Sequence, residues 1–300
     1  MKKIPVIIDT YPGIDDALAL LLAFQSDVLD IKLITTTAGN VALEKTTHNA
    51  LYLVEKYGYG IPVAAGAVSA IGGAMAKADD VHGVNGLGDF IIPDDITKRP
   101  IETDAVEAIK DILDAAREKI TVITLGPLTN IANLIDTYPA VTDTIAVMYS
   151  MIGSFDGRGN IVPHAEFNAY CDPDAVRKVL DSGIPVIFSP MELGHQSCIA
   201  KSIFINHEVH KEKDVLIAKM IAGGFDSVTK GAFSLHDPNT IMAVTNPEYY
   251  DFPSCDIRFT DTGEYRGQFK VLLSKTGAYK VQTIRDVDAV KNCFLKEIYR

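Results

Sequence analysis

Cysteine is scarce in this sequence, with four among 300 residues. These four (Cys171, Cys198, Cys255 and Cys293) form no CxxC pair and lie too far apart for a disulfide framework or a cysteine metal site. We therefore expect free thiols in a reducing cytoplasm. Long apolar runs are also missing: none reaches the roughly 18 residues that a membrane span needs. Because a strand-like segment already begins at residue 4, we expect no leader peptide.

Positive charge is in deficit as well. The 28 Lys and Arg residues against 39 Asp and Glu give a formal net charge of −11, which argues against a nucleic-acid binder. The balance suits neutral or cationic small molecules, or carboxylates gathered around a metal ion. The sequence has no GxxxxGK[ST] motif and no convincing GxGxxG after a strand, so nucleotide-phosphate binding is unsupported. With no linker or repeat, we expect one domain over residues 1–300.

Short apolar segments alternate with helical patterns along most of the chain. Strands are predicted at residues 4–8, 31–37, 120–125, 144–150 and 185–189, and helices at 15–24, 43–57, 128–137 and 173–182. This alternation is typical of an α/β fold, a mostly parallel open sheet with helices on both faces. Residues 201–236 are predicted to be helical, and 252–260 and 267–274 to be later, antiparallel strands. Ligands of such sheets bind at the carboxyl ends of the strands.

The loop after the first strand is rich in acids. Residues 9–17 read DTYPGIDDA. One interpretation is structural, because Pro and Gly form turns and acids in a first helical turn complement the positive end of the helix. The other is functional, because the carboxylates of Asp9, Asp15 and Asp16 are hard oxygen ligands that suit Ca²⁺ or Mg²⁺. The loop alone leaves both interpretations open.

Further motifs follow in order over residues 4–240. They read AGNV at 38–41, VHGVNGLG at 81–88, LGPLTNIA at 125–132, GN at 159–160, AEFN at 165–168, DP at 172–173 and HDP at 236–238. Together with the acidic loop, this series resembles the inosine–uridine type nucleoside hydrolases. The resemblance implies their α/β fold with a Rossmann-like core. Two positions depart from the family pattern, since Tyr11 and Asn85 each replace an aspartate.

The resemblance also implies roles for individual residues. The family's Ca²⁺ ligands fall on Tyr11, Asp16, the backbone carbonyl of Leu125, and Asp237. Its substrate-binding groups fall on Asp15, Asn160, Glu166 and Asn168, with Asn40 and the backbone of Met151 as supporting groups. His236 and His82 are the candidates for contacting or protonating the base. We assign no role to the other five histidines.

The implied reaction releases a free base and ribose from a ribonucleoside. Hydrolysis of an N-ribosidic bond passes through a ribosyl group that resembles an oxocarbenium ion, as in glycoside hydrolysis. The site must therefore activate a water, hold and stabilise the cationic sugar, and assist the leaving base. A divalent ion supplies the activated water, and acids around the sugar favour its positive charge.

Tyr11 stands where the family has an aspartate that binds Ca²⁺ and accepts a proton from the attacking water. A phenol with a reference pKa near 10 is neutral at pH 7, ligates Ca²⁺ weakly and projects toward the ribose or water space. We therefore predict strongly weakened hydrolysis and doubtful Ca²⁺ binding. Whether Tyr11 is a natural or an introduced change is open. The alternative is a non-catalytic nucleoside- or ribose-binding protein. A phosphatase with Asp9 as nucleophile is disfavoured, because the loop lacks the partner acid of such enzymes.

Base preference and assembly are less constrained by the sequence. Purine or pyrimidine selection is expected to depend on residues 70–90 and 220–236, and Asn85 removes a charge near the expected mouth of the site. Because the chain has no tryptophan, Phe225 and Phe233 are the stacking candidates in the second region, unless both face the core. The resemblance implies a homodimer or homotetramer.

Overall fold

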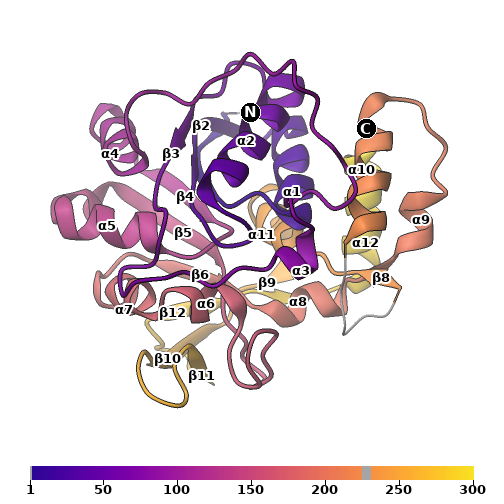
Figure 1. The fold of residues 1–300 in the computed structure, drawn as a ribbon. Helices are drawn as coiled ribbons and strands as arrows, with labels where there is room; N and C mark the ends of the chain where they lie inside the picture. The colour runs from indigo at the N-terminus through magenta and orange to yellow at the C-terminus, as the bar shows by residue number, and fades with distance from the viewer. Residues whose placement is uncertain (1, 225–230) are drawn as a thin grey trace.

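The computed structural model describes residues 2–224 and 231–300 (Figure 1). Within these residues the largest sheet has nine strands in the order β11-β10-β12-β6-β5-β4-β1-β2-β3. The strands of this sheet are β1 (Ile4–Thr10), β2 (Leu29–Thr36), β3 (Val63–Ala65), β4 (Ile120–Thr124), β5 (Ile145–Met151), β6 (Val186–Ser189), β10 (Ser254–Thr260), β11 (Gln268–Leu273) and β12 (Tyr279–Val281). Two short pairs, β7 (Ile199–Ala200) with β8 (Ala232–Phe233) and β9 (Tyr250–Asp251) with β13 (Thr283–Ile284), lie outside it.

Helices connect these strands. They are α1 (Ile14–Gln25), α2 (Leu43–Leu53), α3 (Asp79–His82), α4 (Ala105–Ala115), α5 (Thr129–Thr137), α6 (Phe167–Cys171), α7 (Pro173–Asp181), α8 (Met191–Gln196), α9 (Lys201–Ile205), α10 (Glu212–Gly223), α11 (His236–Thr245) and α12 (Val287–Ile298). A π-helical turn, Val54–Gly58, continues α2, and 3₁₀ turns cover Pro139–Thr144 and Pro247–Tyr249. No helix within the two described ranges combines the length and apolar character needed to cross a membrane.

The sheet lies between two apolar cores, and strand β1 shows why. Its side chains alternate, so that Val6 and Ile8 enter one core while Ile7 enters the other, and all three are fully buried. The first core includes apolar residues of α1, α2 and α10–α12, and the second those of α4, α5 and α7. Figure 1 shows the strands between these two groups of helices. Burial on both faces explains the continuous apolar strands of the sequence.

The predicted fold class is confirmed. Every neighbouring pair from β3 across to β12 is parallel, whereas β10 pairs antiparallel with both β12 and β11. The two late strands were expected to be antiparallel and are so. The loops after β1, β2, β4, β5 and β6 consequently leave the sheet at one edge, the edge at which the motifs of the sequence lie.

The prediction of continuous helix over residues 201–236 is wrong. Helix α9 ends at Ile205, α10 starts at Glu212, and Ala232–Phe233 forms a strand. The backbone N–H groups of His210 and Lys211 donate to Asp214 Oδ2, both at 2.9 Å, which fixes a new helix start instead of a continuing helix. Phe233 lies in the core rather than facing a ligand, and Phe225 lies outside the described residues.

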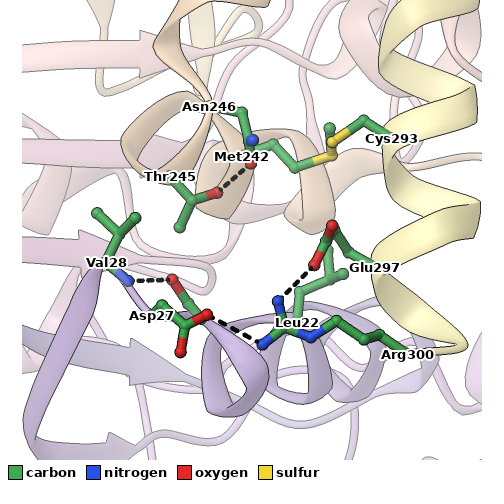
Figure 2. A pocket seen from close by; sticks show the side chains of 10 residues that line it. Leu22, Asp27, Val28, Met242, Thr245, Asn246, Cys293, Glu297 and Arg300 are labelled. Atoms are coloured by element: carbon green, nitrogen blue, oxygen red, sulfur yellow. Dashed lines mark hydrogen bonds and ion pairs between the residues drawn. The ribbon is translucent and has the colours of Figure 1, made fainter.

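A cavity of about 190 Å³ lies at the opposite edge of the sheet, near the amino end of β2 (Figure 2). The side chain of Arg300 borders it and makes ion pairs at 3.3 Å with Asp27 and Glu297. Arg300 also donates to the Gln25 carbonyl at 2.7 Å. These contacts connect the end of the described chain to the turn after α1, and none of the candidate site residues borders this cavity.

Candidate functional site

Asp16 organises the acidic loop. Its Oδ1 accepts from the Thr10 hydroxyl at 2.6 Å and from the Tyr11 N–H at 3.1 Å. Its Oδ2 accepts from the Gly13 N–H at 3.1 Å and from Asn40 Nδ2 at 3.0 Å. Asn40 also donates to the Tyr11 carbonyl at 3.2 Å. The loop is therefore held in one conformation by a buried carboxylate and by an amide from the turn after β2.

Three carboxylates from distant parts of the chain meet beside this loop. One oxygen from each of Asp15, Asp16 and Asp237 lies within 4.8 Å of the other two, a spacing that can hold a metal ion. Asp237, in the first turn of α11, is 2% exposed, and its Oδ2 has no hydrogen-bond donor among the described residues. A buried carboxylate oxygen without a donor is a suitable ligand for a hard cation. The acidic residues present therefore fit a divalent ion.

Burial and mutual repulsion act on the same carboxyls. Burial, followed by the charge of Asp15, raises the pKa of Asp16 to about 6. The pKa of Asp237 is raised well above its ordinary value, first by burial and then by Asp15 and Asp16. Each shift reflects the cost of placing negative charge among like charges in a dry site. A bound cation would offset that cost.

Asp9 does not belong to this group, although the metal-binding interpretation of the loop counted it together with Asp15 and Asp16. Its Oδ1 accepts from the Thr35 hydroxyl at 2.5 Å and from Asn130 Nδ2 at 2.7 Å. Asn130 donates as well to the Thr36 carbonyl at 3.1 Å and accepts from the Ala67 N–H at 2.9 Å. Asp9 and Asn130 thus join the ends of the strands beneath the site, and Asp237 supplies the third clustered carboxylate.

The ring of Tyr11 fills a narrow slot at the site. A Cβ added to Gly39 would lie 2.5 Å from Cδ2 of the ring, and one added to Gly126 would lie 2.8 Å from Cδ1. The ring also stacks on Phe167, with centroids 6.4 Å apart. Two glycines and an aromatic ring therefore fix its position, and 7% of Tyr11 remains exposed.

The surroundings of Tyr11 keep its hydroxyl protonated. The pKa of the phenol is raised well above its ordinary value, first by burial and then by the charge of Asp16, Asp237, Asp15 and Glu166. A phenolate would add a further negative charge to a cluster that is already repulsive. At neutral pH Tyr11 is consequently a neutral hydrogen-bonding group and not an anionic ligand.

Asn168 connects two backbone positions of the site. Its Nδ2 donates to the carbonyls of Leu125 and Met151, both at 2.9 Å. Its Oδ1 is buried and has no hydrogen-bond partner in residues 2–224 and 231–300. The structure thus brings together the carboxyl ends of β4 and β5, where Leu125 offers the predicted metal carbonyl and Met151 the predicted ribose contact. The unpartnered oxygen can accept a hydrogen bond from a sugar hydroxyl.

Glu166 is held by backbone amides and is not a solvated acid. It caps α6 by accepting from the N–H groups of Asn168 at 2.7 Å and Ala169 at 3.1 Å, and it accepts from the Gly153 N–H at 2.9 Å. Burial nevertheless dominates and raises its pKa to about 7. Asn160 lies close by in the chain, with its Oδ1 accepting from the Phe167 N–H at 2.8 Å.

The raised pKa of Glu166 leads to a prediction about stability. The carboxyl of Glu166 keeps its proton up to about pH 7 in the folded protein, whereas its ordinary pKa is 4.5. The protonated carboxyl therefore contributes fully to the free energy of unfolding below pH 4.5, and this contribution is lost as the pH rises to about 7. Glu166→Gln removes this titrating carboxyl. The difference in the free energy of unfolding between the parent protein and the variant should therefore shrink between pH 4.5 and 7. Urea unfolding at several pH values, with a chelator present, measures this difference. Glu102→Gln, which replaces an exposed glutamate, is the control. A constant difference would contradict the assignment.

His82 lies against the acidic loop in its neutral form. Its Nδ1 accepts from the Ile14 N–H at 3.2 Å and lies 3.9 Å from Asp15 Oδ1. Burial lowers its pKa to about 4, so this contact with Asp15 is not an ion pair at neutral pH. An imidazole that accepts at Nδ1 carries its proton at Nε2. His82 can therefore donate a hydrogen bond to a nucleobase. Of the two predicted roles of His82, this favours contacting the nucleobase over protonating it.

His236 precedes Asp237 at the start of α11. Its ring lies edge-to-face against His195, with centroids 5.2 Å apart. Sequence reasoning assigned no role to His195, and it did not single out Phe167, which stacks on Tyr11. Phe167 lies within the AEFN motif at 165–168, so its position in the sequence gave a signal, whereas that of His195 gave none.

The chain thus has an α/β fold with a mostly parallel sheet, and beside the loop after β1 lies an acidic cluster that could hold a metal ion. The chain belongs to the inosine-uridine preferring nucleoside hydrolase family, whose sequence profile matches residues 6–292.

Individual relatives agree with this assignment. The chain is 35% identical to the non-specific ribonucleoside hydrolase RihC of Klebsiella pneumoniae over 269 residues, which is 88% of this chain and 86% of the relative. Among solved structures, a plant nucleoside hydrolase, PpNRh1, has a TM-score of 0.92 at 28% identity, covering 99% of both chains. A purine-preferring ribonucleoside hydrolase from Gardnerella vaginalis has a TM-score of 0.89 at 25% identity, covering 98% of both.

Proposed function

We propose that this chain hydrolyses the N-glycosidic bond of ribonucleosides to free base and ribose, and that Tyr11 makes the reaction slow. The observation that carries the proposal is the convergence of Asp15, Asp16 and Asp237 on one point at the carboxyl edge of the sheet. Curated relatives with about 35% identity are ribonucleoside hydrolases, which supports the same reaction here.

The family implies Ca²⁺, and Asp16, Asp237 and the carbonyl of Leu125 are the groups that would hold it. When bound, a divalent ion lowers the pKa of a ligated water and so provides a nucleophile near neutral pH. The partnerless Oδ2 of Asp237 supports this role, as does the spacing of the three carboxylates. Asp16 also accepts four hydrogen bonds within the protein, so the same carboxylate would both ligate the ion and hold the loop.

The sugar would be held by oxygen-bearing groups on two sides. We assign Asp15 and Asn168 to the ribose hydroxyls, with Asn160 and Glu166 at the far end of the ring and Asn40 and the Met151 backbone in support. The Asn168 Oδ1 has no partner in the described part of the chain and so is available as an acceptor. Negative charge around the ring stabilises the positive charge that develops on the ribosyl group.

The leaving base would lie between the two histidines. His82 can donate from Nε2, because its Nδ1 is already an acceptor for the Ile14 N–H. His236 is held beside Asp237, and we assign it the contact with the base on the opposite side. Hydrogen bonds to the departing base lower the barrier because the negative charge on its nitrogen grows as the bond breaks.

Tyr11 weakens this arrangement at the activation of the attacking water, the step that needs a general base. A neutral phenol accepts a proton poorly, and loss of a general base commonly lowers a rate by about 10²–10⁴-fold. The ring also replaces one carboxylate next to the proposed cation position, and affinity for Ca²⁺ falls with the charge count of the ligands.

The proposal is tested by incubating the protein with purine and pyrimidine ribonucleosides in Ca²⁺ and separating free base and ribose by chromatography. We expect slow release that Asp15→Asn lowers further. Asp174→Asn, on the surface of α7, is the control and should leave the rate unchanged. Absence of release from every nucleoside, even with Tyr11→Asp, would remove the support for this function.

A second candidate is nucleoside or ribose binding without turnover. The feature in its favour is the fixed, buried ring of Tyr11, which takes the position of a proton acceptor but leaves in place the groups that we assign to the sugar. Calorimetry with ribose and with nucleosides, with and without Ca²⁺, distinguishes the candidates. Tight binding without product favours the second, and the absence of any binding excludes it.

A further inference from the structure

The short helix α8 contacts both halves of the proposed site. On the sugar side, Glu192 Oε1 accepts from the Ser154 hydroxyl at 2.9 Å and from the Phe155 N–H at 2.7 Å. The Met191 N–H donates to the Gly153 carbonyl at 2.9 Å, and Gly153 in turn donates to Glu166. The start of α8 therefore fixes the loop whose Gly153 N–H binds Glu166, a residue that we assign to the sugar side of the site.

The second half of the same helix contacts the ring of His236 through Gly194 and His195, which we call the seat of His236. A Cβ added to Gly194 would lie 2.1 Å from His236 Nδ1 and 2.7 Å from Cγ, so the imidazole rests directly on the glycine backbone. The His195 ring meets it edge-to-face at 5.2 Å with an interplanar angle of 75°. Only glycine at 194 leaves room for this ring, and His195 restricts its rotation from the side.

A buried hydrogen-bond network keeps α8 and α11 in register. Asn239 Nδ2 donates to the Ser197 hydroxyl at 2.8 Å, which itself donates to the Leu193 carbonyl at 2.8 Å. The Tyr250 hydroxyl donates to Asn239 Oδ1 at 2.8 Å, and Gln282 Nε2 donates to the Asn239 carbonyl at 2.9 Å. Ser197, Asn239, Tyr250 and Gln282 are at most 1% exposed. The seat is therefore rigid, because such networks allow few alternative arrangements.

We infer that Gly194 and His195 are positioning residues that fix the ring of His236 for the leaving base, while Glu192 fixes the sugar side from the other end of α8. The inference rests on the proposed function. A displacement of about 1 Å at a reacting group can lower a rate by about 10²-fold, so a seat that holds the ring affects turnover without touching substrate. The effect should appear only for bases that need help to leave.

The test compares two substrates in the Tyr11→Asp protein, whose turnover is expected to be measurable. One substrate is a natural nucleoside such as inosine, and the other is p-nitrophenyl riboside, whose leaving group departs without assistance. For Gly194→Ala and His195→Ala we expect kcat on inosine to fall by about 10–10²-fold, and kcat on the nitrophenyl riboside by less than about threefold. His195→Phe keeps an aromatic ring and should recover most of the loss. Gln196→Ala, exposed on the same helix, is the matched control.

Equal losses on both substrates would overturn the inference, since a general structural defect would act on both. If Tyr11→Asp hydrolyses neither these two substrates nor any other ribonucleoside, the proposed function fails, and the positioning is then decided by NMR on the unmodified chain. There, Gly194→Ala should shift and broaden the imidazole signals of His236, while Gln196→Ala should leave them in place. Unchanged His236 signals overturn the inference. If Gly194→Ala does not fold, the comparison of His195→Ala with His195→Phe decides alone.

Discussion

Replacing Tyr11 with aspartate is expected to raise kcat/KM for ribonucleosides by about 10²–10⁴-fold, the usual contribution of a general base. The carboxylate restores both a proton acceptor and a fourth acid beside Asp15, Asp16 and Asp237. Ca²⁺ should then bind tightly enough to stabilise the fold, by about 2.7 kcal/mol at a concentration 100-fold above Kd. Base release by chromatography and thermal unfolding with and without Ca²⁺ measure the two effects.

Two further substitutions separate chemistry from space at position 11. Tyr11→Asn empties the slot between Gly39 and Gly126 without adding charge, and Tyr11→Phe keeps the ring and removes the hydroxyl. Both should stay near the parent rate and show little Ca²⁺-dependent stabilisation. If Tyr11→Asn were as active as Tyr11→Asp, the ring would be acting as a steric block and the argument from the missing base would be wrong.

The second large effect is expected from Asp237→Asn in the Tyr11→Asp protein. We expect Ca²⁺ affinity to fall by about 10²-fold or more, because affinity follows the charge count and an amide N–H₂ could take the place of the partnerless Oδ2. Hydrolysis should fall in parallel at a fixed Ca²⁺ concentration. Calorimetric titration with Ca²⁺ measures the affinity, and assays of hydrolysis before and after chelation measure the activity.

The control is Asp288→Asn, which removes an exposed acid from α12 and should change neither property. A chelator should abolish the activity of Tyr11→Asp. In the presence of chelator, adding Asp237→Asn should therefore lower the activity little further. Full activity of Tyr11→Asp in excess chelator would contradict a role for a divalent ion and leave the carboxylates with a purely electrostatic function.

Much of the fold could be predicted from the sequence. Strand β1 was recognisable because a short apolar run is followed, three residues later, by a Pro-Gly turn and an apolar helix, a local pattern that does not depend on distant contacts. The region 201–236 was mispredicted because its breaks depend on tertiary contacts. The bonds from His210 and Lys211 to Asp214 and the pairing of Ile199 with Phe233 have no counterpart in helical periodicity.

The site divides in the same way. Residue chemistry alone grouped Asp9 with its neighbours in the loop, but the bonds from Thr35 and Asn130 hold Asp9 beneath the site. Asp237 could be linked to the loop only through the motif series, because proximity in the fold leaves no trace in local spacing. Gly194 and His195 gave no signal of any kind, since their contact with His236 arises from the register of two helices.

The slot around position 11 also bears on how this chain can change. Because glycine borders the side chain at both ring edges, a bulky ring is accommodated here without displacing the backbone on either side. Aspartate and tyrosine codons differ by their first base alone. If Tyr11 slows the reaction as we propose, a single point mutation is enough to move a lineage between a cation-dependent catalyst and a slow or inactive protein, with the rest of the fold unchanged.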